Sequence, residues 1–218
     1  MLPGKGKQTV VRRIPSEEEF EKLIAEIRVP TWQLVDGKRG GQRPARNDES
    51  ADFAEFEGRA GVGQAEAASV TWEDIGTERI RFVRTETGKE IFKPIFANLR
   101  PLIERRREAA RIATGGMSPT GRVFKIDNAR NAVAGAIKRL GMLHFTQRNL
   151  RSFLIVGHLD RGVAAKQIAE WQGHRDGGKL IMDTYSEVVR PNHAAYEAEQ
   201  LALADAAVVK MAGKAGAA

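Results

Sequence analysis

The chain has 218 residues, of which 42% are hydrophobic and 29% are charged. A chain of this length and apolar content can bury a core, which excludes wholesale disorder and predicts one domain, alone or with a tail. Lysine and arginine outnumber aspartate and glutamate by 35 to 28, and the resulting net charge of +7 indicates a polyanionic partner, for which nucleic acid is favoured over a membrane. A soluble basic protein without such a partner is the alternative.

The absence of cysteine excludes disulfides, thiolate metal sites and a cysteine nucleophile. No histidine pair has zinc-ligand spacing, so we expect neither a metal nor another cofactor. No apolar run approaches the ~18 residues of a membrane helix, and the N-terminus lacks the apolar core of a signal peptide. We therefore expect a cytoplasmic protein without a membrane partner.

The first quarter of the chain is predicted to hold an arm and two helices. Residues 1–13 carry four basic side chains and no acidic one, so they form a basic arm that either contacts phosphate or is simply solvated. A capping box at Ser16, followed by apolar residues at helical spacing, predicts a helix that ends before Pro30. The Gly- and Arg-rich segment 36–47 predicts a loop, and the acidic segment 48–57 predicts a helix.

The middle of the chain contains the one clear strand signal. Residues 79–95 alternate around a Thr-Gly turn and predict a β-hairpin. A helix is predicted to open at Leu99 and to end at the arginine triplet 105–107, which is more typical of a solvated helix face than of a DNA contact. Asp127 is expected to cap the next helix, which Gly141 closes.

The last third reads as helix throughout. Thr146 is expected to cap a helix that Gly162 stops, and three further helices are predicted at 164–172, 178–186 and 192–213. The fold class is therefore mainly α, formally α+β, with a small antiparallel β-hairpin.

Residues that suit phosphate chemistry gather between 146 and 188. Arg148 and Arg151 stand three residues apart, so both project from one helix face and can form a double guanidinium clamp on a phosphate. Gly173-His174 and then Tyr185 follow. An isolated tyrosine usually packs its ring, and an arginine often forms a structural salt bridge. Each residue alone is therefore weak evidence for a functional site, and the combination is stronger evidence.

Three short motifs carry a resemblance to a known family. Leu150-Arg151, Gly173-His174 twenty-three residues later and Asp183-Thr184-Tyr185 eleven residues beyond are similar to the second arginine, the Gly-His motif and the nucleophile motif of tyrosine recombinases. Residues 61–75 and the hairpin sequence TGKEIFKPI are also similar to that family. From about 14 to 190 the chain resembles the catalytic domain of lambda-type phage integrases and bacterial dimer-resolution recombinases.

The resemblance implies site-specific DNA recombination or integration, by strand breakage and rejoining through a 3′-phosphotyrosyl intermediate, without ATP or metal. It makes Tyr185 the nucleophile and lets Arg151 and His174 hold the non-bridging phosphate oxygens. Arg148 adds charge there, and Lys89 is the candidate for protonating the leaving 5′-oxygen.

Three positions depart from the family pattern. Gly63 stands where the family has its first catalytic arginine, and Arg148 where a histidine is usual. Glu86 stands at the register of the hairpin lysine, for which Lys89 across the turn and Arg84 just before it are candidate substitutes. Arg59, one helical turn before Gly63, and Arg148 are candidate substitutes for the missing arginine. These departures predict an impaired site, and the alternative function is a cleavage-deficient DNA-binding paralogue that acts as an accessory or regulatory factor. An unrelated basic RNA-binding protein is a third interpretation, which the motifs disfavour.

We expect the chain to divide into the basic arm 1–13, a catalytic domain at 14–190, and a C-terminal helix and tail at 191–218. The resemblance implies double-stranded DNA as partner and a homo-oligomer on it, a tetrameric synapse, in which the last helix docks onto a neighbouring protomer; that helix equally fits simple packing. A monomer in isolation, the DNA target and the direction of recombination stay open. With so short a segment before the first helix, a bacterial or phage-encoded fragment or minimal protein is expected.

Overall fold

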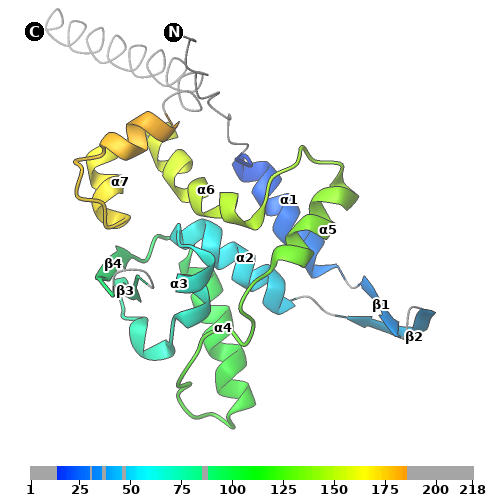
Figure 1. The fold of residues 1–218 in the computed structure, drawn as a ribbon. Helices are drawn as coiled ribbons and strands as arrows, with labels where there is room; N and C mark the ends of the chain where they lie inside the picture. Colours follow the sequence, from blue (N-terminus) through cyan, green and yellow to red (C-terminus); the bar gives the residue numbers. More distant parts are fainter. Residues whose placement is uncertain (1–13, 30, 36–37, 46–47, 85–87, 186–218) are drawn as a thin grey trace, which may run out of the picture.

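The computed structural model describes residues 14–29, 31–35, 38–45, 48–84 and 88–185, so the basic arm, Glu86 and the segment 191–218 lie outside the described residues. The elements are α1 (Glu17–Arg28), β1 (Thr31–Val35), β2 (Lys38–Ala45), α2 (Asp48–Ala60), α3 (Gln64–Ser69), the 3-10 turn η1 (Trp72–Asp74), β3 (Arg79–Val83), β4 (Glu90–Pro94), α4 (Arg100–Ala113), α5 (Arg130–Leu140), α6 (Gln147–Asp160) and α7 (Ala165–Trp171). Residues 179–185 are also helical. The prediction of a mainly helical fold with small antiparallel β-structure is confirmed (Figure 1).

Helix α2 runs through the middle of the helical body and contacts both α1 and α6 (Figure 1). The rings of Phe20 in α1 and Phe153 in α6 stack with centroids 4.1 Å apart. A Cβ atom on Gly58 of α2 would lie 2.5 Å from the Phe20 ring, so a glycine is needed for this close approach. The packing fixes α6, which carries the predicted arginines, against the core.

Local signals account for the ends of α1. The Ser16 hydroxyl accepts a hydrogen bond from Glu19 N at 3.2 Å, and the Glu19 carboxylate accepts one from Ser16 N at 2.9 Å. This is the expected capping box, which satisfies two backbone donors that would otherwise lack partners.

Within the described parts of the chain, no helix combines the length and the apolar character needed to cross a bilayer.

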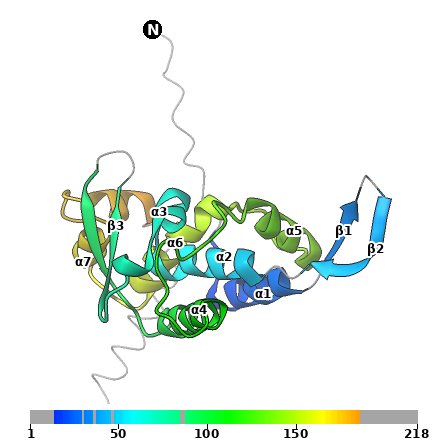
Figure 2. The same ribbon diagram turned by 90° about the horizontal axis from the view of Figure 1, so that it is seen from below.

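The predicted hairpin at 79–95 is confirmed as β3 and β4, paired antiparallel from Arg79 opposite Pro94 to Val83 opposite Glu90. Alternation along β4 turns Ile91 and Lys93 inward. Helix α7 packs against β4 (Figure 2), which brings the segment after α7 close to the hairpin.

Two sequence predictions about strands are wrong. Residues 36–47 were expected to form a loop and 79–95 the one hairpin, but β1 and β2 form a second antiparallel pair with an irregularity between Trp32 and Leu34. Both views show this pair extending away from the helices (Figures 1 and 2). Ladder hydrogen bonds come from the backbone and need no apolar alternation, so the Gly- and Arg-rich sequence of β2 concealed a strand. Pro44 is tolerated because a two-stranded pair has free edges.

Two helix boundaries also differ from the prediction. Helix α4 continues past the arginine triplet to Ala113 and stops before Gly115, whose φ is +66°. Helix α5 begins at Arg130 rather than at an Asp127 cap. The Asp127 carboxylate instead accepts a hydrogen bond from Arg122 at 2.6 Å, which removes it from a capping role.

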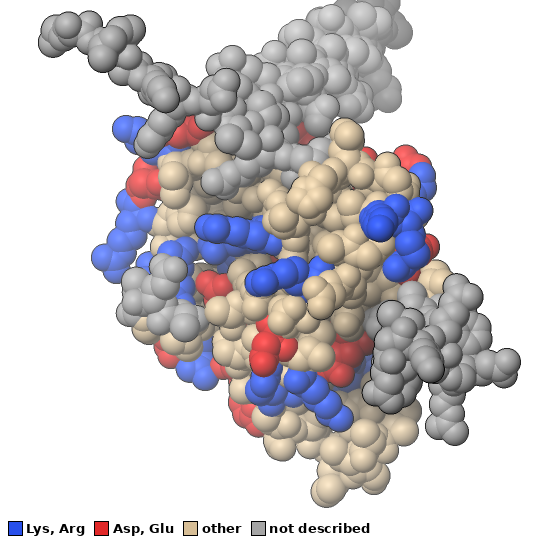
Figure 3. All heavy atoms as spheres, turned by 45° about the vertical axis from the view of Figure 1, so that its right-hand side comes forward, with Lys and Arg blue, Asp and Glu red and all other residues tan. Residues whose placement is uncertain are grey.

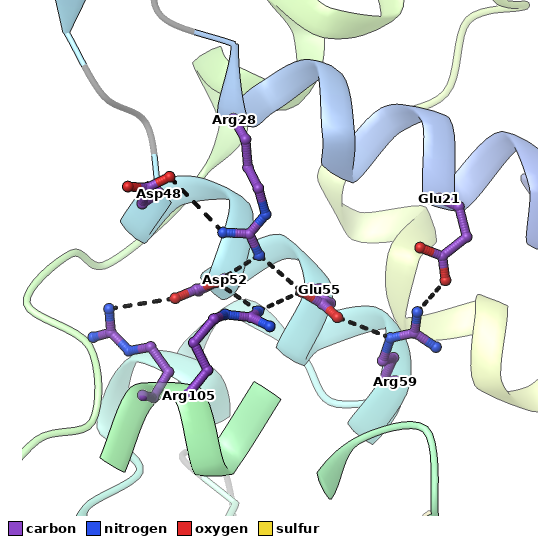
Figure 4. Close-up of polar contacts among 8 residues, drawn as sticks. Glu21, Arg28, Asp48, Asp52, Glu55, Arg59 and Arg105 are labelled. Atoms are coloured by element: carbon purple, nitrogen blue, oxygen red, sulfur yellow. Dashed lines mark hydrogen bonds and ion pairs between the residues drawn. The ribbon is translucent and has the colours of Figure 1, made fainter. Parts of the chain in front are cut away.

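The arginine triplet joins α4 to α2 through ion pairs (Figure 4). Asp52 of α2, 5% exposed, accepts hydrogen bonds from Arg28 at 2.6 Å and from Arg105 at 2.9 Å. Glu55 accepts from the same two guanidinium groups at 3.0 and 2.9 Å, and Arg106 pairs with Asp52 at 3.6 Å. Arg106, whose side chain is 17% exposed, is therefore structural, and the solvated-face interpretation is wrong for it. Arg105 also pairs with carboxylates of α2, but its side chain stays 45% exposed.

Candidate active site

Helix α6 carries the two arginines predicted to form a clamp. Its first turn is fixed by Asn149, whose side-chain oxygen accepts hydrogen bonds from Thr146 N at 2.9 Å and Thr146 Oγ1 at 2.8 Å. Leu150 is completely buried on the core side. Arg148 and Arg151 both line the same two cavities, so the structure places them together as expected.

The two cavities have volumes of about 630 and 550 Å³ and share three lining arginines, Arg84, Arg148 and Arg151. The smaller cavity is also lined by His174 and Tyr185. Four of the five predicted site residues therefore surround one cavity, although they come from α6, from the segment after α7 and from the helical segment 179–185.

Tyr185 stands at the end of the described helical segment. Its ring is packed in the core and is 7% exposed, and its hydroxyl lies 2.8 Å from Ser152 Oγ. Ser152 directly follows Arg151 on α6, so this hydrogen bond ties the phenol to the helix that carries the arginines. Sequence analysis did not identify Ser152, because its contact depends on how 179–185 packs on α6.

The position of His174 depends on the glycine before it. Gly173 has φ +70°, and a Cβ atom there would lie 2.6 Å from Ile91 Cδ1, so a larger residue is excluded on two grounds. His174 N donates to Ala169 O at 2.8 Å. Burial, followed by the charge of Arg84, lowers the pKa of the imidazole below its usual 6.5, while Asp176 opposes this shift. The ring is therefore mostly neutral near pH 7.

Lys89 lies near the site but lines neither of the two cavities. Its Nζ donates to Gly173 O at 3.3 Å, behind the Gly-His segment. Arg84, at the other end of the hairpin turn, lines both cavities and donates to Gln172 O. In the described structure, the hairpin group nearest the cavities is therefore a guanidinium and not the predicted lysine.

Gly63 is adjacent to Arg151, as its place in the resemblance implies. A Cβ atom on Gly63 would lie 3.7 Å from Arg151 Nη1, and the Glu66 carboxylate occupies the space at 2.5 Å. Arg59 does not fill this position. It is 7% exposed and is bound by Glu21 and Glu55 on the α1 side of α2 (Figure 4). The interpretation of Arg59 as a substitute for the missing arginine is therefore wrong.

Two further residues at this site were missed by sequence analysis. Gln172, fully buried, accepts through Oε1 from Arg151 at 3.3 Å and from Lys93 at 3.1 Å. The alternation of β4 was a usable signal for Lys93, because it places position 93 on the same inward face as Ile91. Nothing in the sequence marked Gln172.

The charges around the site suit an anion rather than a cation. In the described part of the chain, no group of three or more histidine, aspartate and glutamate side chains could hold a metal ion. Lysine and arginine side chains gather in several groups on the face shown in Figure 3, with acidic side chains beside some of them. A site with three shared arginines can bind and polarise a phosphate.

Comparison with known proteins supports the same fold. No family model matches the chain, and no curated protein matches it in sequence. Among solved structures, the catalytic domain of bacteriophage HP1 integrase superposes with a TM-score of 0.59 and 17% identity, over 80% of this chain and 88% of that domain. The chain has the tyrosine recombinase catalytic-domain fold.

Two DNA-bound tyrosine recombinase structures are also similar. A lambda integrase fragment, residues 75–356, solved as a dimer bound to a COC′ core site, has a TM-score of 0.57 and 16% identity over 82% of this chain. The XerH site-specific recombinase, bound to a palindromic difH substrate, has a TM-score of 0.57 and 14% identity over 85% of this chain. The present chain spans 60% of the lambda fragment and 53% of XerH.

Proposed function

We propose that this chain is a catalytic domain for site-specific DNA recombination, which breaks and rejoins a DNA strand through Tyr185. The observation that carries the proposal is the single cavity lined by Arg148, Arg151, His174 and Tyr185. The fold and the DNA complexes of similar proteins support the same function.

The proposed reaction is a phosphoryl transfer that needs no external energy source. The Tyr185 oxygen attacks the phosphorus, a bond forms between them, and the bond from phosphorus to the 5′-oxygen breaks. The phenolic proton leaves, the 5′-oxygen takes up a proton, and a 3′-phosphotyrosyl ester and a free 5′-hydroxyl result. Rejoining reverses each step. One phosphate ester is exchanged for another, so the bond energy is kept in the covalent intermediate and the reaction requires neither ATP nor metal.

The side chains have distinct parts in this proposal. Arg151 and Arg148 hold the non-bridging oxygens with charge-assisted hydrogen bonds, and neutral His174 donates a further one. Ser152 orients the Tyr185 hydroxyl. Lys89 remains the candidate proton donor to the 5′-oxygen, and to act it has to leave Gly173 O and turn toward the cavity.

On DNA we propose assembly into a homo-oligomer, because the lambda structure similar to this chain is a dimer on its core site. The second candidate function, a DNA-binding factor that does not cleave, is favoured by the departures at Gly63, Glu86 and Arg148. For Gly63 the reason is that loss of one oxyanion donor typically lowers a rate about 10²–10³-fold.

A covalent-capture experiment separates the two functions. The chain is incubated with a pool of nicked duplexes of randomised sequence, and SDS-resistant adducts are recovered and sequenced. We expect adducts with the parent chain and none with Tyr185→Phe, which removes one oxygen. Tyr196→Phe is the matched control, because the chain contains two tyrosines, and it should leave adduct yield unchanged.

The outcomes discriminate clearly. Duplex binding by the parent without any adduct supports the DNA-binding factor instead. An adduct that persists in Tyr185→Phe shows that the nucleophile is assigned wrongly.

A further inference from the structure

Lys93 is a buried cation beside the candidate site. It is 5% exposed, on the inward face of β4. Its Nζ donates to Gly61 O at 2.6 Å, to Ala60 O at 3.2 Å and to Gln172 Oε1 at 3.1 Å. Three acceptors match the three hydrogens of an ammonium group.

This lysine is costly to the fold. All three of its hydrogen-bond partners are neutral carbonyl groups, and a buried charge without an ionic partner is expensive. Burial and then the charge of Arg151 lower the pKa of Lys93 well below its usual 10.5; Arg84 adds to the effect and Glu66 opposes it. If packing were the sole requirement at position 93, an apolar residue there would make the fold more stable than a buried lysine does.

Gln172 connects Lys93 to the arginines of the cavities. Its Oε1 accepts from both Lys93 Nζ and Arg151 Nη2, and its backbone oxygen accepts from Arg84. The side chain is completely buried, so it cannot exchange these donors for water. Displacing Lys93 therefore removes one of the two donors that fix the orientation of the Gln172 amide against Arg151.

The position of Lys93 also coincides with the departure at Gly63. The two backbone carbonyls that it binds, those of Ala60 and Gly61, immediately precede the segment where a side chain on residue 63 would meet Arg151. Because a neutral amine has only two hydrogens and cannot donate to all three acceptors, the geometry indicates a protonated Lys93. Its ammonium group adds positive charge beside Arg151 at the end of α2, where Gly63 offers none.

We propose that Lys93 is a positioning residue of the phosphate site, which holds Arg151 through Gln172 and supplies the positive charge that Gly63 lacks. The proposal rests on the proposed function, in which Arg151 binds a DNA phosphate. It deepens that function by assigning the compensation for the missing arginine to this chain's own buried lysine.

The first test is the salt dependence of binding to a short DNA duplex. Lys93→Met keeps the length of the side chain and removes its charge. If Arg151 then no longer engages its phosphate, the slope of log Kd against log salt falls by about 0.9, and Kd rises about tenfold at fixed salt. Lys22→Met, which removes an exposed lysine on α1, is the matched control and should leave the slope unchanged.

The second test asks whether an arginine at position 63 restores binding when Lys93 has lost its charge. Gly63 has φ −80°, which any residue adopts, and an added side chain displaces the flexible end of Glu66. Gly63→Arg should restore both Kd and slope in the Lys93→Met background, and should change them less in the parent. A purely structural lysine predicts no such restoration.

A folded Lys93→Met chain with parental Kd and slope overturns the proposal, as does failure of Gly63→Arg to restore them. If Lys93→Met does not fold, Gln172→Leu decides, because it leaves Lys93 on its two backbone carbonyls but cuts its link to Arg151. A parental slope in Gln172→Leu overturns the proposal. Adduct formation is measured separately. A parent chain that binds DNA without forming an adduct contradicts the proposed cleavage but leaves the positioning role of Lys93 intact. A parent chain that does not bind DNA overturns both the proposed function and the role of Lys93.

Discussion

Glu57 of α2 is a carboxyl group that the proposed chemistry does not use. It is 2% exposed, lines the larger cavity and accepts a hydrogen bond from Gln147 Nε2 at 2.7 Å. Burial raises the pKa of Glu57 from 4.5 to about 8, although the hydrogen bond from Gln147 opposes the shift. The group is therefore mostly protonated in the folded chain at neutral pH and ionised in the unfolded chain.

This difference predicts a pH-dependent stability. The folded state binds one more proton than the unfolded state between the two pKa values, so the free energy of unfolding is greatest below pH 4.5 as far as Glu57 is concerned and falls as pH rises through 8. Glu57→Gln removes this dependence and should stabilise the chain at pH 8.5 by about 2–4 kcal/mol relative to the parent. Urea unfolding at pH 5, 7 and 8.5 measures it.

The control for this prediction is Glu108→Gln, which alters an exposed carboxylate paired with Arg111. Its stability should follow the parental pH profile. An identical profile for the parent and Glu57→Gln would show that Glu57 is ionised in the folded chain.

At the scale of elements, sequence patterns correctly predicted the helices and strands that local interactions determine. The Ser16 capping box begins α1, and alternation gave the β3/β4 pair. The same reasoning missed the β1/β2 pair, because its ladder is made by the backbone of a Gly- and Arg-rich segment. The start of α5 was misplaced because Asp127 is taken by a tertiary contact with Arg122.

The candidate site divides in the same way. Motif spacing identified Arg151, His174 and Tyr185, and the fold brings them to one cavity. Gln172 could not be found from the sequence, since its importance comes from contacts with residues 21 and 79 positions away. Which side of the hairpin Lys89 faces also depends on packing against the Gly-His segment.

Asp52 links three helices and gives a prediction at this scale. It is 5% exposed and contacts Arg28 of α1 as well as Arg105 and Arg106 of α4. Asp52→Ala leaves these cations with fewer partners, and since they are partly exposed the expected loss is about 2–3 kcal/mol, below the usual cost of breaking a fully buried pair. Chemical denaturation should show a lower midpoint with an unchanged slope.

Glu78→Ala is the matched control, because it removes a carboxylate whose pair with Arg100 is exposed, and surface pairs contribute little. Its midpoint should stay close to that of the parent. Equal effects of the two substitutions would show that the ion pairs joining α1, α2 and α4 do not stabilise the chain more than surface pairs.

At the scale of the whole molecule, two groups of arginines among the described residues lie in contrasting environments. Arg28, Arg59, Arg105 and Arg106 are paired with carboxylates of α1 and α2. Figure 4 labels the first three of them. Arg84, Arg130, Arg148 and Arg151 line the larger cavity, and among the described residues none of these four is ion-paired with a carboxylate. These four cavity-lining arginines are therefore available to bind a polyanion.

The cavity arginines predict a steep salt dependence of DNA binding. If the cavity arginines neutralise several phosphates, the Kd for duplex DNA should rise at least about tenfold from 50 to 200 mM salt, because each neutralised phosphate contributes about 0.9 to the slope. Arg148→Ala should lower the slope by about that amount and weaken binding to all sequences alike, since phosphate contacts carry no base information. Arg111→Ala, at the end of α4 and paired with Glu108, should leave the slope of log Kd against log salt unchanged.

Fluorescence anisotropy with a labelled duplex measures Kd for the parent and the two variants. A flat salt response of the parent, or equal slopes for Arg148→Ala and the parent, would contradict a phosphate-binding surface at these cavities.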